Sequence, residues 1–295
     1  MVLVHVKETV MIQKHSVRRL ISSLVLIAAV LGLAVQPALA APLVPPRSLQ
    51  SGSVATVTVF AAASLTDAFK ELAHNYELYN PGVKVVFNFA GSQVLSQQIN
   101  QGAPADIFAS ANTAQMQVAL KGGRVSTSQV FVRNRLVVIV PAGNPGNIKG
   151  LQDLAKPGLQ LVLAAQAVPV GQYALDFLTK ASADPTFSAS FKNDVLKNVV
   201  SYEDNVKSVF AKVALGEADA GIVYTTDVLG ADAVKVKRLY IPDNLNTVAT
   251  YPIAVVNDTK VGYWARGFVR YVLAEDGQLI LWKYGFITNI IPTRR

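Results

Sequence analysis

The spacing of hydrophobic positions changes repeatedly along the chain from about residue 54 onward. The apolar run Val54–Phe60 predicts a buried strand, and apolar residues three and four apart over Leu65–Tyr76 predict an amphipathic helix. The next predicted elements are the strand Val83–Phe89, a helix from Ser92 to Gly102 and the strand Ala105–Ser110. Strands alternating with helices in this way are typical of a mostly parallel, doubly wound sheet.

A second set of elements follows, and a third portion ends the chain. The predicted strands are Arg135–Pro141, Leu159–Gln166, Ala220–Tyr224 and Tyr251–Val256. The predicted helices are Val170–Lys180, Val206–Val213, Trp264–Leu273 and Gln278–Tyr284. We therefore expect an α/β fold of two doubly wound lobes, with residues 54–136 plus 249–295 in lobe I and residues 137–248 in lobe II. Periodicity alone does not show that the chain returns to lobe I.

The N-terminal region has the pattern of an export signal. A basic start precedes the apolar run Leu20–Val35, which ends in small residues, so we expect a signal peptide over residues 1–40 with cleavage after Ala40. Residues 41–53 are rich in Pro, Ser and Gly and predict a flexible leader. A retained membrane anchor and a start at Met11 stay open as alternatives. The expected product is an exported or periplasmic soluble protein.

Composition excludes several chemistries. The sequence has no cysteine, so thiol nucleophiles, disulfides and thiolate metal sites are ruled out. Beyond residue 40 its one histidine is His74, which excludes a metal site built from several histidines. The net charge of +8 falls to +5 when the predicted signal, with four basic residues and one acidic residue, is removed. This charge gives little support to nucleic-acid binding, and no pattern calls for a cofactor.

Four predicted strand-to-helix junctions share one pattern: a strand ends, a small or hydroxyl residue follows, and a helix begins. They read "AAASL" at residue 61, "AGSQ" at residue 90, "VPVGQYA" at residue 168 and "EDNVKS" at residue 203. A helix N-terminus presents unpaired N–H groups that bind anions, and such junctions lie where ligands bind in open α/β sheets. The alternative for Ser64 and Ser92 is a simple N-cap, with Asp67 placed close to a capping box for Ser64.

The segments "VTVFAAASLTDAFKEL", "FAGSQVLSQQINQGAPADIFASA", "VPVGQYA", "ADAGIVYTTDV" and "YPIAVV" resemble the periplasmic molybdate-binding proteins of ABC-type molybdate transporters. The likeness runs in order from about Val54 to Phe286. It implies the type II periplasmic-binding-protein fold, in which a hinge joins the two lobes and a tetrahedral oxyanion is bound between them. By motif, the ligand-binding residues would be Ser64, Ser92, Val170, Val206 and Tyr224.

Two positions depart from that family's pattern. The family often has Asp-Pro where this chain reads "AAQAVP", and often has alanine at the position of Val170. The second difference keeps the backbone N–H but alters the width of the pocket, so the preference between molybdate and tungstate stays open.

The resemblance implies a solute-binding protein that captures molybdate, and also tungstate, and delivers it to a membrane permease. It implies no enzymatic activity, no cofactor and no nucleic-acid partner. A monomer is the default expectation. A dianion without a proton needs donors only, and none of the proposed ligand residues is charged. The open alternatives are a protein for sulfate or selective for tungstate, an exported hydrolase with Ser64 as nucleophile, and a ligand-sensing domain.

Overall fold

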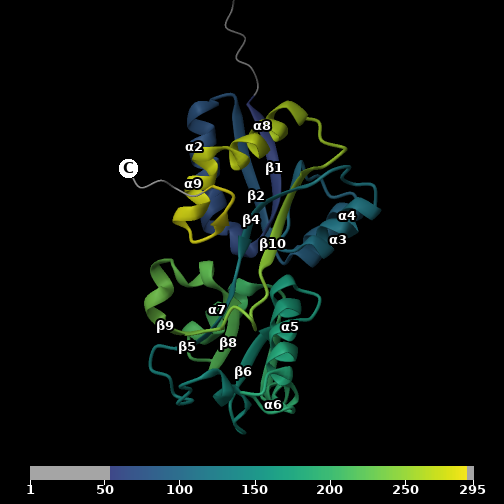
Figure 1. Cartoon of the computed structure of the whole chain (residues 1–295). Helices are drawn as coiled ribbons and strands as arrows, with labels where there is room; N and C mark the ends of the chain where they lie inside the picture. Colours follow the sequence, from purple (N-terminus) through teal and green to yellow (C-terminus); the bar gives the residue numbers. More distant parts are fainter. Residues whose placement is uncertain (1–53, 291–295) are drawn as a thin grey trace, which may run out of the picture. The chain divides into compact units, whose positions relative to one another are not determined.

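Two β-sheets, each flanked by helices, make up the part of the chain that the structure describes, residues 54–290 of a computed structural model (Figure 1). The predicted signal peptide and leader lie outside these residues. Within residues 54–290, no helix combines the length and apolar character needed to cross a membrane. The mixed α/β class with two lobes is the fold that the sequence predicts.

The first sheet has six strands in the order β11-β4-β10-β3-β1-β2. Its strands are β1 (Ala55–Ala62), β2 (Val83–Ala90), β3 (Ile107–Ala109), β4 (Gln129–Asn134), β10 (Ala249–Val255) and β11 (Ile287–Thr288). Its helices are α2 (Thr66–Tyr79), α3 (Ser92–Asn100), α4 (Thr113–Lys121), α8 (Gly262–Leu273) and α9 (Glu275–Lys283). We call this unit lobe I. Strand β1 pairs in parallel with β2 and β3, whereas β10 pairs antiparallel with β3 and β4.

The second sheet has five strands in the order β7-β6-β8-β5-β9 and forms lobe II with its helices. Its strands are β5 (Leu136–Pro141), β6 (Leu161–Ala164), β7 (Val199–Glu203), β8 (Ala220–Tyr224) and β9 (Val236–Tyr240). Its helices are α5 (Pro169–Ala183), α6 (Phe191–Lys197) and α7 (Val206–Ala214). Among residues 54–290 there are also four short 3-10 turns, namely η1 (Ala63–Leu65), η2 (Leu151–Ala155), η3 (Thr225–Val228) and η4 (Ala231–Lys235).

The chain passes between the two sheets at two places. Strand β4 ends at Asn134 in the first sheet, and Leu136 already pairs with Tyr224 in the second, one residue before the lobe boundary expected from the sequence. The return runs from β9 to β10, and β10 then pairs with β4 (Figure 1). The C-terminal strands and helices therefore join lobe I, a return that periodicity alone does not show.

Apolar faces explain why these segments fold as they do. In α2 the buried residues Ala68, Phe69, Leu72, Ala73 and Tyr76 form one stripe that packs on the first sheet, as their spacing predicts. Every residue of β5 is buried, which matches its uninterrupted apolar sequence. The strand predicted at Val54–Phe60 continues through Ala62, so Ala61 and Ala62 belong to the sheet, whereas Ala63 begins η1.

Candidate functional site

A small pocket lies where the two lobes meet. It brings together all five residues named from the sequence. Its lining residues are Ala62, Ala63, Ser64, Ala90, Gly91, Ser92, Ala111, Val168, Pro169, Val170, Asn205, Val206 and Tyr224. None of them carries a charge, so a polar ligand here would be held by backbone N–H groups, hydroxyls and one amide.

The first turns of three helices meet at this pocket. Helix α3 begins at Ser92, α5 at Pro169 and α7 at Val206. The first N–H groups of a helix have no intrahelical acceptor and lie at the positive end of its dipole. Because Pro169 has no N–H, Val170 supplies the first available donor of α5. Three such helix ends attract an anion without any cationic side chain.

Two glycines allow the backbone to come this close. A Cβ at Gly91 would collide with the carbonyl oxygen of Asp204 in the other lobe, so glycine lets lobe I approach lobe II beside the pocket. A Cβ at Gly171 would collide with the carbonyl oxygen of Ala165, so glycine allows the sharp turn into α5.

Neither serine is an N-cap, so the alternative considered from the sequence is wrong for both. Ser64 lies in η1, the N-cap of α2 is Leu65, and no side chain caps that helix. Ser92 is the first residue of α3, and its Oγ accepts a hydrogen bond from the Ala111 N–H at 3.0 Å. Because the Ser92 oxygen acts as the acceptor in this bond, the hydrogen of its hydroxyl is available for another acceptor.

The hydroxyl of Tyr224 is the clearest sign of a ligand. Tyr224 ends β8, is 1% exposed and lines the pocket. Within the described part of the chain, its Oη has no hydrogen-bond partner. Burial raises the pKa of this phenol well above its ordinary value, so it remains a donor at neutral pH. A buried unpaired hydroxyl is costly, and a bound acceptor would remove that cost.

Polar contacts join the lobes beside the pocket. The Nζ atom of Lys207 lies 3.0 Å from Oδ2 of Asp67. The Gln93 side chain donates to the carbonyl oxygen of Asp204 at 2.9 Å. The sequence analysis missed both contacts, because nothing local connects α2 or α3 of lobe I to the segment around α7.

Asp227 lies close to Lys207 of this ion pair and is almost completely buried. Its Oδ2 accepts the Tyr224 N–H at 3.1 Å, and its Oδ1 is 3.6 Å from Nζ of Lys207. Burial outweighs the attraction of Lys207 and raises the pKa of Asp227 to about 6. Burial also opposes the charge of Lys207, but Asp227 and Asp67 outweigh it and raise the pKa of that lysine.

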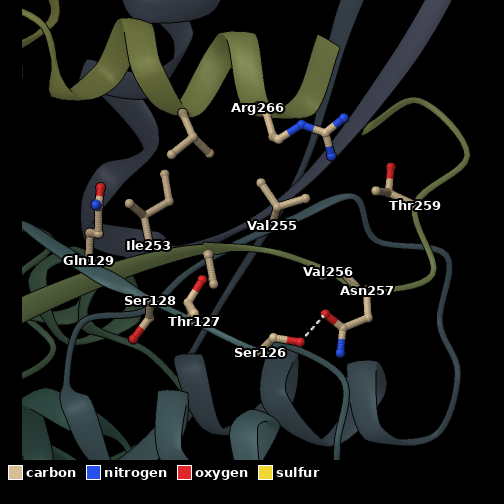
Figure 2. Close-up of a pocket in the computed structure, with 12 residues that line it drawn as sticks. Ser126, Thr127, Ser128, Gln129, Ile253, Val255, Val256, Asn257, Thr259 and Arg266 are labelled. Atoms are coloured by element: carbon tan, nitrogen blue, oxygen red, sulfur yellow. Dashed lines mark hydrogen bonds between the residues drawn. The ribbon is translucent and has the colours of Figure 1, made fainter. Parts of the chain in front are cut away.

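A larger, open hollow lies on lobe I, and none of the five residues lines it (Figure 2). Hydroxyl and amide side chains, several apolar side chains and exposed Arg266 line it. The Ser126 hydroxyl donates to Oδ1 of Asn257 at 2.8 Å, the contact marked in Figure 2. Among the described residues, none of those that line this hollow has a buried hydroxyl without a partner. The hollow therefore lacks the unpaired buried hydroxyl that distinguishes the pocket between the lobes.

Comparison with known proteins places these features in context. Residues 57–287 match the family described as bacterial extracellular solute-binding protein. The molybdate-binding protein ModA of Mycobacterium tuberculosis is 40% identical over 232 residues, covering 78% of this chain and 84% of the relative. The sulfate-binding protein of Synechococcus elongatus is 23% identical over 258 residues, covering 80% and 74%. A solved substrate-binding domain of a putative molybdenum ABC transporter from Clostridium difficile is 30% identical, with a TM-score of 0.59 over 79% of this chain and 99% of that one.

Proposed function

The chain belongs to the bacterial extracellular solute-binding proteins, and from this premise we propose that it captures molybdate between its lobes and delivers it to an ABC-type permease. The proposed ligands are Ser64, Ser92 and Tyr224 through their hydroxyls, and Val170 and Val206 through their backbone N–H groups. The resemblance seen in the sequence is confirmed by the 40% identity to a molybdate-binding protein.

The unpaired Tyr224 hydroxyl is the observation that carries this proposal. It lies in the same uncharged pocket as Ser64 and Ser92 and near three helix N-termini. A fully deprotonated oxyanion accepts hydrogen bonds on every oxygen and offers no proton, so it suits a pocket of donors. A ligand that retains a proton, as phosphate does near neutral pH, would favour a site with an acceptor carboxylate, and the pocket lining has none.

The size of the anion distinguishes the remaining candidates. Sulfate carries the same charge as molybdate but is smaller, so its oxygens would not reach donors on both lobes equally well. The sulfate-binding relative is also the more distant one. Tungstate has the same shape and charge as molybdate, and we propose that it binds too.

The remaining proposals concern export, oligomeric state, cofactors, nucleic-acid partners and enzymatic activity. We propose that residues 1–40 are an export signal and that the protein works as a monomer without a cofactor or a nucleic-acid partner. We also propose that it is not an enzyme. The polar partner of Ser64 is the Tyr251 hydroxyl, and burial raises the pKa of that phenol far above its ordinary value. A phenol that keeps its proton at neutral pH cannot act as the base of a serine nucleophile.

A panel of anions tests the proposal. The melting temperature and binding heat of the purified protein are measured with equal concentrations of molybdate, tungstate, sulfate and phosphate. We expect molybdate and tungstate to raise the melting temperature and to bind with measurable heat, since a ligand of the native state stabilises it. A shift with sulfate or phosphate that exceeds the shift with molybdate would refute the assignment.

A further inference from the structure

A buried side chain at the crossing between the lobes fixes the direction of several hydrogen bonds. Asn134 ends β4 and is 0% exposed. Its Oδ1 accepts from the Arg135 N–H at 2.9 Å and from the Thr225 hydroxyl at 3.0 Å. Because a backbone N–H can only donate, the amide oxygen must face Arg135, and the Nδ2 group faces the opposite way.

Two oxygen atoms receive the Nδ2 side of Asn134. Nδ2 donates to Thr226 Oγ1 at 2.8 Å and makes a longer contact of 3.5 Å with Tyr251 Oη. An amide NH2 has no lone pair to offer, so Tyr251 Oη is the acceptor in that contact. The single phenolic proton of Tyr251 is therefore free to be donated elsewhere.

The Ser64 hydroxyl oxygen lies within reach of that proton. The Tyr251 Oη and Ser64 Oγ atoms are 3.0 Å apart, and both residues are buried. Burial raises the pKa of Tyr251 far above its ordinary value, so the phenol keeps its proton at neutral pH. When Ser64 Oγ accepts from Tyr251, its own hydrogen is left for a different acceptor.

We propose that Tyr251 is a positioning residue for anion binding: it donates to Ser64 Oγ and so directs the Ser64 hydrogen to the bound oxyanion. This inference rests on the proposed function. Donation to an oxygen also strengthens that hydroxyl as a donor in turn, since linked hydrogen bonds polarise one another. The serine is thus prepared for an anion before the ligand arrives.

The chain of hydrogen bonds also connects the two lobes. Thr225 and Thr226 directly follow Tyr224, the hydroxyl donor of lobe II, and both bond to Asn134. Asn134 contacts Tyr251, and Tyr251 bonds to Ser64, the hydroxyl donor of lobe I. A partly buried network at the crossing therefore links Ser64 of lobe I to the residues that directly follow Tyr224 in lobe II.

The substitution Tyr251→Phe isolates the hydroxyl. The Tyr251 ring packs edge-on against Tyr224, Phe131 and Phe286, with ring centroids 5.6–6.4 Å apart, and phenylalanine keeps these contacts. The matched control is Tyr76→Phe, which also removes a buried hydroxyl of lobe I. Tyr76 donates to the Trp264 carbonyl oxygen at 3.3 Å and does not line the pocket.

The experiment measures the molybdate dissociation constant by calorimetry in a double-mutant cycle. We expect Tyr251→Phe to weaken binding about tenfold, and Tyr76→Phe to leave it within about twofold, in line with the energy of one hydrogen bond to a charged group. In a Ser64→Ala background, Tyr251→Phe should cause no further loss, because it acts through the serine hydroxyl. A role in packing alone would instead give the same loss in both backgrounds.

The outcomes separate this inference from the proposed function. If the wild-type protein binds molybdate and Ser64→Ala weakens binding, but Tyr251→Phe does not, the positioning role is overturned and the function stands. A loss that persists in full in the Ser64→Ala background also overturns it. If the wild-type protein binds no molybdate, both fail together. Melting temperatures of the unliganded variants establish that each one folds.

Discussion

The Nζ atom of Lys207 lies 3.0 Å from Oδ2 of Asp67 and joins α7 of lobe II to α2 of lobe I. Lys207 directly follows Val206, which lines the pocket, so the ion pair lies at the edge of the site. Ligand binding between hinged lobes requires that the closed arrangement be favourable. A contact made only between the lobes contributes to closure and, through it, to affinity.

Asp67→Asn tests this contribution. The side chains of Asp67 and Lys207 are 57% and 35% exposed, and exposed ion pairs contribute roughly 0–1 kcal/mol. We expect the affinity for molybdate to fall by up to about fivefold at low ionic strength, with a smaller effect at high salt.

Asp194→Asn is the matched control for this test. Asp194 pairs with Lys197 within lobe II at 2.9 Å, so its loss does not affect the contact between the lobes. Calorimetry at two salt concentrations compares the two variants. Equal losses of affinity in both would show that Asp67 has no specific role in closure.

Tyr224→Phe should change stability and affinity in opposite directions. The substitution removes a buried hydroxyl that has no partner within the described residues, so the unliganded protein should melt at the same temperature as the wild type or higher. The affinity for molybdate should fall at least about tenfold, because a donor to a charged ligand is lost. Scanning calorimetry and binding calorimetry check the two effects, and an unchanged affinity would remove Tyr224 from the site.

Val206→Pro tests a backbone donor directly. Val206 is the first residue of α7, where proline is well tolerated, and Asn205 before it has the extended φ of −160° and ψ of 166° that a following proline requires. The substitution removes one N–H from the pocket while the Asn205 cap on the Ser208 N–H can remain. We expect molybdate to bind about tenfold more weakly.

The control for this variant is Val206→Ala, which trims the buried side chain but keeps the N–H. Binding by Val206→Ala should stay within about threefold of the wild type, since only apolar contacts change. Circular dichroism verifies that α7 is intact in both variants. If alanine and proline weaken binding equally, the N–H of Val206 is not a ligand.

Asp227→Asn should change how stability depends on pH. The pKa of Asp227 is about 6 in the folded protein, against an ordinary value of 3.8, so folding favours the protonated form. Its contribution to stability is fully present below about pH 4 and is lost as the pH rises through 6. The variant has no such loss, so it should gain melting temperature relative to the wild type between pH 4 and pH 7.

Asp153→Asn gives a control of opposite sign. The hydrogen bond from Lys156 lowers the pKa of Asp153, so its stabilising contribution exists at neutral pH and is lost as the pH falls. Asp153→Asn should therefore melt below the wild type by a constant amount between pH 4 and pH 7 and approach the wild type only below about pH 4. Asp227→Asn should instead gain on the wild type as the pH rises from 4 to 7. Parallel curves for Asp227→Asn and the wild type would contradict the burial argument.

The local sequence predicts most of the residues that line this site, but few of the contacts that hold them in place. The junctions around Ser64, Ser92, Val170 and Val206 are predictable because a strand, a small residue and a helix follow one another along the chain. The partners of those residues are distant: Tyr251 is 187 positions from Ser64, and Lys207 is 140 positions from Asp67. No period or motif records such pairs, so only the folded chain shows that Ser64 bonds to a tyrosine and caps no helix.

Three of the elements missed from the sequence have a weak pattern of their own. Strand β4 mixes buried and exposed residues without strict alternation, and β9 is mostly exposed. Helix α6 is only seven residues long, too short for a helical period to stand out. Such segments take their structure from pairing with neighbours, as β4 does between β10 and β11, and not from their own pattern.

The most direct test is a crystal structure of the protein grown with molybdate, using the anomalous scattering of molybdenum to locate the ion. We expect one strong peak in the pocket between the lobes, with oxyanion oxygens within hydrogen-bond distance of the Ser64, Ser92 and Tyr224 hydroxyls and of the Val170 and Val206 nitrogens. A molybdenum peak elsewhere on the protein, with this pocket holding only water, would contradict the proposed site and the function built on it.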